Sequence, residues 1–194
     1  MAGNNGSEIR VAGTGKILVA KAGTAIPADT AAPWSAEWAD LGYTTTDGIK
    51  FNKKDKIDPV DTWQSVSPAR FIYSDRDLTV KFQLLQLNKD TLPFFMGGDA
   101  VTAVGTPANG QFKYELASNP KKDERALAIE FSDGGEATYR FIMQRGQVTE
   151  TEEMALTRTG AVKLGVTFTA LAVDDTKPLA TILMKDKSYG APAA

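Results

Sequence analysis

The sequence contains neither histidine nor cysteine among its 194 residues. Without them there is no Ser-His-Asp or Cys-His catalytic group, no thiolate, and none of the usual ligand sets for zinc, copper or haem. Any catalysis would depend on carboxylates, lysine, tyrosine, serine or threonine. We therefore expect no catalytic residue, no cofactor and no metal site.

The chain also lacks an excess of positive charge, because 22 Lys and Arg residues stand against 24 Asp and Glu, for a formal net charge of −2. A dedicated nucleic-acid binder carries a basic surface that attracts phosphates, so tight DNA binding is not expected. No apolar run approaches the ~18 residues that a membrane-spanning helix needs. We therefore expect no association with a membrane.

A length of 194 residues fits one domain, which we expect to span residues 8–188. A domain of this size removes roughly 70% of its unfolded-state surface from water, so it needs no disulfide or metal to hold its core. Residues 1–7 have neither the positive charge nor the apolar stretch of a signal peptide, so we expect a flexible N-terminal tail. Residues 189–194 are expected to form a flexible C-terminal tail.

Apolar residues recur with a period of two over most of the chain, which is typical of half-buried β-strands. In the clearest strand, 76–84, apolar side chains share one face (Leu78, Val80, Phe82, Leu84) and polar side chains share the other (Asp77, Thr79, Lys81, Gln83). Residues 127–143 are expected to form a hairpin that turns at Asp133-Gly134-Gly135. Further strands are expected at 9–20, 41–43, 48–51, 162–170 and 179–184, the last buried on both faces because it is continuously apolar.

Segment 88–98 departs from this alternation. Asn88 and Asp90 favour the start of a helix, Pro93 fits a first turn, and Gly97-Gly98 fits a helix end. We expect one short α-helix here. The sequence thus predicts an all-β fold with one short α-helix, an antiparallel β-sandwich or barrel with a long loop between two strands.

The long loop, residues 53–75, is an unusual excursion for a compact domain and is therefore expected to be functional or disordered. Its aromatic residues argue against disorder. An arm with large apolar side chains and charges of both signs suits docking onto another protein. Nine of its residues are candidate contacts: Lys53, Lys54, Lys56, Asp58, Asp61, Trp63, Arg70, Phe71 and Tyr73.

Two patterns have a catalytic or binding interpretation that the sequence disfavours. The run Gly13-Thr14-Gly15-Lys16 suggests a phosphate loop, but it lacks the earlier glycine and is followed by Ile17 where Ser or Thr is needed, so a strand with a glycine bend fits better. Paired acids occur at 58/61, 75/77, 150/152/153 and 174/175. Solvated turns and strand edges account for them, and none has the spacing of a calcium loop.

Two other functions stay open at this point. In a carbohydrate-binding or adhesive β-sandwich, exposed tryptophans stack on sugars, and Trp34, Trp38 and Trp63 are the candidates. Aromatic residues in a β-rich chain are more often core or interface residues. A carboxylate-based hydrolase requires two acids that converge in a pocket with separated pKa values.

The succession of residues from 63 to 98 resembles the central block of major tail tube proteins of long-tailed siphophages, especially those that infect actinobacteria. The residues that carry the resemblance are Trp63-Gln64-Ser65, Pro68, Arg70, the run 77–86, Asn88, Lys89, Thr91 and Gly97-Gly98. Segments 13–20, 38–43 and 47–48 resemble the beginning of the same family. The specificity lies in the order of these residues, since no single motif is diagnostic.

This resemblance implies a β-sandwich with one flanking helix whose copies close into six-membered rings. The rings stack into a hollow tube around a tape measure protein, and DNA later passes through the bore without specific binding. Tail terminator and tail-tip proteins are the other implied partners. The subunit is then a structural protein of the virion tail, without enzymatic activity, and is assembled in the cytoplasm of the host bacterium.

The resemblance also implies roles for individual segments. The arm 53–75 reaches a neighbouring ring, so its nine candidate residues become contacts between rings or subunits. The N-terminal segment orders on a neighbour. Thr79, Lys81 and Gln83, on the polar face of the clearest strand, are the candidates for residues that line the bore.

Overall fold

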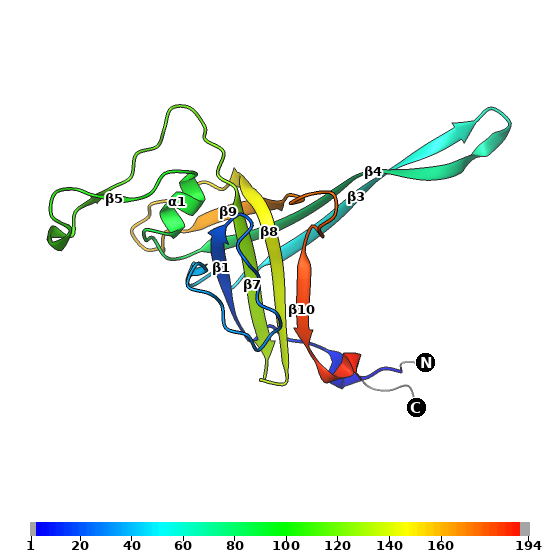
Figure 1. Cartoon of the computed structure of the whole chain (residues 1–194), viewed down its shortest axis with the longest axis horizontal. Coiled ribbons are helices and arrows are strands. Elements are labelled where there is room, and N and C mark those ends of the chain that lie inside the picture. The colour runs from blue at the N-terminus through cyan, green and yellow to red at the C-terminus, as the bar shows by residue number, and fades with distance from the viewer. Residues whose placement is uncertain (1–2, 191–194) are drawn as a thin grey trace.

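The computed structural model describes residues 3–190 of the chain as a mostly antiparallel β protein (Figure 1). Its strands are β1 (Thr14–Lys21), β2 (Ala39–Asp40), β3 (Lys50–Thr62), β4 (Ser65–Leu84), β5 (Thr102–Ala103), β6 (Phe112–Lys113), β7 (Arg125–Asp133), β8 (Ala137–Thr151), β9 (Leu164–Ala170) and β10 (Thr181–Lys185). Within residues 3–190 there is one α-helix, α1 (Thr91–Met96), with 3₁₀ turns at Gly6–Glu8, Pro107–Asn109 and Lys187–Tyr189. The predicted all-β fold with one short helix is confirmed.

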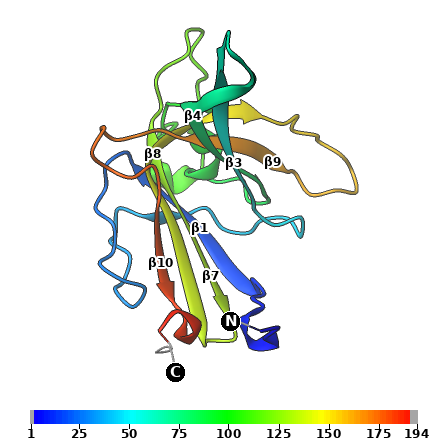
Figure 2. The ribbon, with the colours of Figure 1, turned by 90° about the vertical axis from the view of Figure 1, so that its right-hand side faces the viewer.

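Strand β8 holds the two halves of the main sheet together. The strand order is β2-β1-β7-β8-β9-β4-β3, and β10 pairs with β8 beside this path. Residues 138–142 of β8 pair with β10, whereas residues 146–151 pair with β9. Side chains of β1 and β7 pack with those of β4 and β9 in one core, although these strand pairs are not neighbours in the sheet. The sheet therefore folds over on itself at β8, and the layers cross in Figure 2.

The main core lies between these two layers and is closed by α1. The alternation predicted for β4 is confirmed, because Val80, Phe82 and Leu84 are all buried. Phe94 of α1 stacks between Phe82 and Phe168, with ring centroids 6.2 and 6.3 Å apart. Burial of aromatic rings of this size makes a large hydrophobic contribution to stability.

The start of α1 is held by Asn88, which lies outside the helix. The Asn88 Oδ1 accepts hydrogen bonds from the backbone N–H groups of Asp90 and Thr91, each at 2.9 Å. Asp90 occupies the N-cap position but its side chain makes no capping bond. The predicted helix 88–98 is therefore shorter than expected, since Asn88 and Asp90 form a turn before it.

A second, smaller cluster covers the opposite side of β1 and β7. There Leu18, Ala128 and Ile142 pack under Trp38, which is 6% exposed. Trp34 meets Trp38 edge to face at 5.0 Å. Both faces of β1 are thus buried near its middle, which explains its nearly continuous apolar sequence.

Several predicted strands differ in their bounds. The expected strand 9–20 begins only at Thr14, and the short strand expected at 41–43 is found at 39–40. The predicted hairpin is confirmed, with positive φ of 57° and 81° at Gly134 and Gly135. The prediction that 179–184 is buried on both faces is wrong. Among residues 3–190, β10 pairs only with β8, and Ile182 and Met184 on one of its faces are nearly half exposed.

The predicted tails lie partly outside the described residues. Residues 1–2 and 191–194 are not described, so the expectations for them are not tested. Residues 6–8 form a 3₁₀ turn, and residues 187–189 form another. The two turns lie near each other at the lower end of the molecule in Figure 1.

Candidate functional site

The predicted arm is a long two-stranded ribbon that projects from the body (Figure 1). Strands β3 and β4 pair from Lys50 with Lys81 out to Thr62 with Ser65, and only Trp63 and Gln64 form the turn between them. Strand pairing thus supplies the backbone hydrogen bonds that an extended loop would leave to water. Sequence reasoning predicted an arm at 53–75 but not its paired strands, because the pairing register shifts twice within it.

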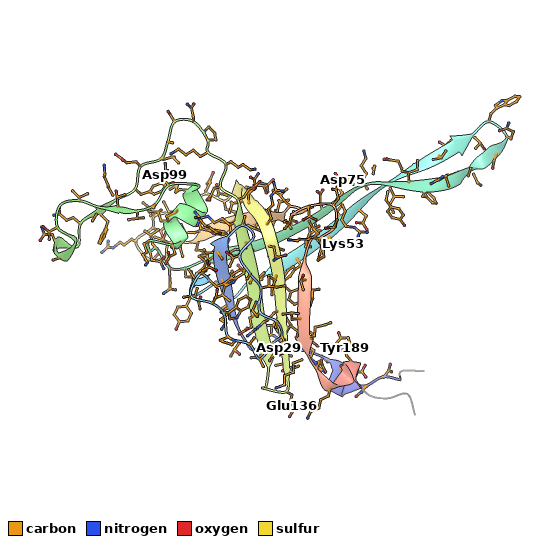
Figure 3. All side chains as sticks on the ribbon, in the orientation of Figure 1. Asp29, Lys53, Asp75, Asp99, Glu136 and Tyr189 are labelled. Atoms are coloured by element: carbon orange, nitrogen blue, oxygen red, sulfur yellow. The ribbon has the colours of Figure 1, made fainter. Side chains whose placement is uncertain are left out.

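Charged side chains fix the base of the arm, where Figure 3 labels Lys53 and Asp75. The carboxylate of Asp55 accepts hydrogen bonds from Arg76 Nε at 2.7 Å and from Lys53 Nζ at 2.5 Å. Arg76 and then Lys53 lower the pKa of Asp55 to about 2. Asp55 therefore stays charged at every physiological pH and holds β4 to β3 where the ribbon leaves the body.

The outer part of the arm has one apolar side and one mostly polar side. Residues directly opposite each other in an antiparallel pair point to the same face. On one face lie Ile57 with Tyr73 and Pro59 with Phe71. We call these four residues the apolar side of the arm.

The opposite face of the arm is dominated by charge. Its cross-strand pairs are Lys54 with Asp77, Lys56 with Asp75, Asp58 with Ile72, and Val60 with Arg70. Opposite charges that face each other across a ribbon stabilise its register. We call this face the polar side of the arm.

The apolar residues of the arm are exposed to an unusual degree. Phe71 is 60% exposed, Tyr73 is 68% exposed, and Trp63 at the turn is 96% exposed. Val66, which sequence reasoning did not single out, is fully exposed next to the turn. An exposed apolar surface of this kind on a charged ribbon is typical of a protein interaction site.

A polar face runs across β4, β9 and the second half of β8. Thr79, Lys81 and Gln83 lie on it, opposite Thr169, Thr167 and Gly165 of β9. Acids from the end of β8 extend over the same face: Glu150 Oε2 lies 3.8 Å from Lys81 Nζ, and Glu152 Oε2 accepts a hydrogen bond of 2.5 Å from Gln83. We call this surface the polar face. Thr79, Lys81 and Gln83, the candidates for lining the bore, therefore lie in a row along β4 on this face.

The other candidate residues have structural roles. Lys16, from the apparent phosphate loop, lies in β1 and pairs with Glu130 at 3.1 Å. Trp34 donates a hydrogen bond to Glu130, and Trp38 is buried, so these two tryptophans form no open platform for a sugar. The acid pairs lie on the arm, at the end of β8 and in the turn before β10. In residues 3–190, no three His, Cys, Asp or Glu residues cluster as a metal site requires.

The two ends of the chain are joined by an ionic cluster. Arg10 contacts both carboxylate oxygens of Asp186, at 2.6 and 2.7 Å, and the Tyr139 hydroxyl donates a hydrogen bond to the same carboxylate. Arg10 and then Tyr139 hold the pKa of Asp186 well below its usual range. The segment before β1 is thereby attached to the segment after β10.

The described residues thus form an all-β body with an exposed arm and a polar face. The sequence profile of a family described as phage tail tube proteins matches residues 1–194, which is the whole chain. The chain belongs to the phage tail tube proteins. A comparison with curated proteins found no match.

Membership of the tail tube family accounts for the features above. The protein is a structural component of the virion tail, it associates with copies of itself to form the tube, and it associates with other tail proteins. Among residues 3–190, no helix has the length and apolar character to cross a bilayer.

Proposed function

We propose that six copies of this tail tube protein close into a ring, that rings stack through their arms, and that the resulting tube surrounds a tape measure protein and later conducts phage DNA into the host. The observation that carries the proposal is the arm, with its aromatic side chains between 60% and 96% exposed. Such a surface is unfavourable in a free subunit and is stabilised when a neighbour covers it.

We propose that the nine arm residues named from the sequence are contacts between rings or subunits. Phe71 and Tyr73 lie on the apolar side, and Trp63 lies at the turn. The charged residues lie along the two strands of the ribbon. Aromatic residues are common centres of binding energy in interfaces, whereas charges at a rim mainly select the partner and its orientation. The apolar side therefore supplies the affinity.

We propose that the polar face lines the bore, with Thr79, Lys81 and Gln83 among its residues. Its hydroxyl and amide groups are uncharged, and Lys81 is paired with Glu150. Release of counterions by basic residues is what makes DNA bind a protein surface. A face without excess positive charge lets DNA move without being retained.

We further propose that assembly takes place in the cytoplasm of the host bacterium and that tail terminator and tail-tip proteins cap the two ends of the tube. A tube built from repeated head-to-tail contacts has two different ends, because such contacts do not close on themselves. Each end therefore requires its own partner. The long-tailed siphophage class is the proposed source, as the residues from 63 to 98 indicate.

Electron microscopy tests the proposal. The purified protein, concentrated alone and with the tape measure protein, is expected to form rings or tubes in negative stain. Rotational averages of end-on views give the number of subunits in a ring, and a number other than six would correct the stoichiometry. A protein that stays monomeric under all these conditions, and that is absent from the tails of virions, would refute the proposal.

An arm deletion tests the role of the arm separately. Asp58 and Ile72 are directly paired, so an Asn-Gly turn in place of residues 59–71 closes a shorter hairpin without strain. The expected result is a folded subunit, with an unchanged circular dichroism spectrum, that does not polymerise. Tubes formed at the same concentration as by the intact protein would refute the arm assignment.

A further inference from the structure

One face of the sheet is apolar over four strands, from the main core at β1 to the edge strand β10. Two rows of directly paired residues cross β1, β7, β8 and β10, and paired residues point to the same side. The first row is Ile17, Ile129, Phe141 and Ile182; the second is Gly15, Phe131, Tyr139 and Met184. We call these two rows the aromatic face.

The second layer of the sheet does not cover all of the aromatic face. In Figures 1 and 2, β7, β8 and β10 extend below the level at which β3, β4 and β9 cross them. Along the first row, exposure rises from 1% at Ile17 to 46% at Ile182 on the edge strand. In the second row Tyr139 is buried, whereas Met184 on the edge strand is 47% exposed. Phe131 and Phe141 between them are half-buried.

A groove lies along one border of this face. It has a volume of about 680 Å³ and is lined by Phe131 and Phe141, by Phe51 of β3 and by the segment around Tyr43. The rings form a continuous row, since Phe51 lies 4.9 Å from Phe141, and Phe131 lies 6.1 Å from Phe141 and 5.0 Å from Tyr139. Pockets of roughly 300–1,000 Å³ hold ligands as large as several side chains.

The apolar side of the arm lies on the same face of β3 as Phe51, with the charged residues Lys53 and Asp55 between them. Alternate residues along β3 place Phe51, Ile57 and Pro59 on one face. The arm points away from the lower part of the sheet in both views, so it does not reach the aromatic face of its own chain. If the two apolar surfaces meet, they belong to different copies.

The size of the exposed surface fits a contact between copies. An aromatic side chain buries about 150–250 Å². At their exposures, Phe71 and Tyr73 of the apolar side offer on the order of 250 Å², and Trp63 at the turn offers a similar area. A stable interface buries ~800 Å² on each partner, so Phe71 and Tyr73 supply about a third of it, and more than half if Trp63 at the turn takes part.

We propose that the aromatic face and its groove accept the apolar side of the arm of a second copy of this chain. This inference rests on the proposed function and adds the surface on which the arm lands. The contact is head to tail, because the arm and the acceptor are different parts of the molecule. It therefore leaves a free arm at one end and a free acceptor at the other, so that it propagates without limit.

Engineered cysteines test this contact, and the chain has no native cysteine to interfere. Phe71→Cys is placed on the arm and Met184→Cys on the aromatic face, in separate chains. The chains are mixed and assembled before oxidation at a concentration high enough for tubes to form despite the loss of the Phe71 side chain. A disulfide requires the two Cα atoms to lie within ~7 Å. The expected result is a disulfide-linked dimer on a non-reducing gel, at least fivefold stronger than in the control mixtures.

Neighbouring residues supply matched controls. Arg70→Cys lies one residue along the arm but on its polar side, and Lys185→Cys lies one residue along β10 but on the opposite face of the sheet. Both positions are exposed, as are Phe71 and Met184, so all four variants are expected to fold. Mixtures that contain either control are expected to give little cross-linked dimer.

Each outcome has a distinct meaning. If tubes form but residues 71 and 184 cross-link no more than the control pairs do, the acceptor assignment is overturned. The proposed function would then stay intact. A strong cross-link of Met184→Cys to itself would show that two aromatic faces meet, which also overturns it. Absence of tubes for the unmodified protein would instead refute the proposed function.

A second measurement uses assembly itself. The double variant Ile182→Asp/Met184→Asp changes two nearly half-exposed side chains and is expected to keep its thermal midpoint within a few degrees. It is expected to require at least a tenfold higher concentration to form tubes, whereas Lys185→Asp assembles normally. Normal assembly of the double variant would overturn the proposal.

Discussion

The ring of Phe168 lies directly against the backbone of Gly146, at the point where β8 passes from its pairing with β7 to its pairing with β9. A Cβ atom on residue 146 would lie 2.5 Å from Cε1 of Phe168 and 2.5 Å from the carbonyl oxygen of Thr169. Phe168 is completely buried in the main core. The Phe168 ring can lie over the neighbouring strand at this point only because residue 146 has no side chain.

We predict that Gly146→Ala destabilises the protein by about 1–3 kcal/mol, the usual cost of forcing an extra methyl group into a packed core. Either the Phe168 ring or the Thr169 carbonyl has to move. Denaturant unfolding followed by circular dichroism measures the change. Gly13→Ala is the control, since a Cβ there meets nothing within 4 Å, and it is expected to change the free energy of unfolding by less than ~0.5 kcal/mol.

Arg140 is the second site where one substitution is expected to be costly. It is 5% exposed, donates hydrogen bonds to Glu130 and to the carbonyl oxygens of Asp29 and Ala32, and lies 4.8 Å from the centre of the Trp34 ring. We predict that Arg140→Ala costs roughly 3 kcal/mol, because it removes one ionic partner of the partly buried Glu130 carboxylate and the donor to the carbonyl oxygens of Asp29 and Ala32. Unfolding in urea tests this. Arg158→Ala, at an exposed position, is expected to cost almost nothing.

Burial acts to raise the pKa of Glu130, but hydrogen bonds from Trp34, Lys16 and Arg140 outweigh it and place the pKa below its usual range. The carboxylate is therefore charged in the folded protein. A neutral Arg140→Ala would contradict the role given to Arg140 in holding the loop that contains Asp29 and Ala32.

The buried face of a strand could be predicted from the sequence where only one of its two faces is buried. The alternation in β4 gave its buried side directly, and the glycines at 134 and 135 gave the hairpin between β7 and β8. Strand β10 misled the prediction, because its continuously apolar sequence is typical of burial on both faces. Its exposed side belongs to the aromatic face, where the contact proposed above would cover the apolar residues.

The arm shows what sequence alone does not specify. Its composition predicted a docking segment, but the pairing of Ile57 with Tyr73 and Pro59 with Phe71 depends on a bulge at residue 74. The extra residue on β4 brings the apolar residues of the two strands opposite each other. No pattern in the sequence marks the position of this bulge. The apolar and polar sides of the arm could be assigned only from the pairing register of β3 with β4. The aromatic face proposed as its acceptor likewise depends on strand pairing that the sequence does not reveal.

The cluster of Arg10, Asp186 and Tyr139 makes stability depend on acid pH. The folded pKa of Asp186 is depressed below its ordinary value of 3.8, so its contribution is fully present above that value and is lost as the pH falls toward the folded pKa. We predict that Asp186→Asn is destabilising at pH 6 and that the difference from the unmodified protein shrinks at pH 3. Thermal unfolding at both values measures this.

Two comparisons sharpen the acid prediction. Asp175→Asn, in an exposed turn, is expected to leave stability unchanged at both values. Tyr139→Phe removes one hydrogen bond to Asp186 but keeps Arg10, so it is expected to have a smaller effect with the same pH dependence. A difference between Asp186→Asn and the unmodified protein that grows as the pH falls would contradict this account of the cluster.

Substitutions on the two sides of the arm are predicted to differ in how strongly they weaken assembly. Phe71→Ser/Tyr73→Ser is expected to leave thermal stability nearly unchanged, because both side chains are mostly exposed in the subunit. Burial of one such side chain in a tube contributes about 2 kcal/mol, so losing even one raises the concentration needed for assembly roughly 30-fold. Light scattering against concentration gives this value.

The matched variant on the polar side is Lys56→Ser/Asp75→Ser, which removes one directly opposed pair of charges. Exposed ion pairs contribute little, so its assembly is expected to change by less than threefold. Equal effects of the two double variants would mean that the apolar side has no special role in the contact.

The last prediction concerns the bore. On the polar face, Glu150 and Glu152 balance the positive charge of Lys50 and Lys81. The variant Glu150→Gln/Glu152→Gln leaves two uncompensated lysines in every subunit, repeated around each ring. Tubes of this variant are expected to retain short duplex DNA at low salt and to release it as salt increases, because the binding arises from counterion release.

Glu115→Gln/Asp175→Asn makes the same change in net charge at exposed positions away from this face. Tubes of that control are expected to behave like the unmodified protein in a filter-binding assay. If both variants retain DNA equally, net charge alone explains the effect and the polar face does not line the bore.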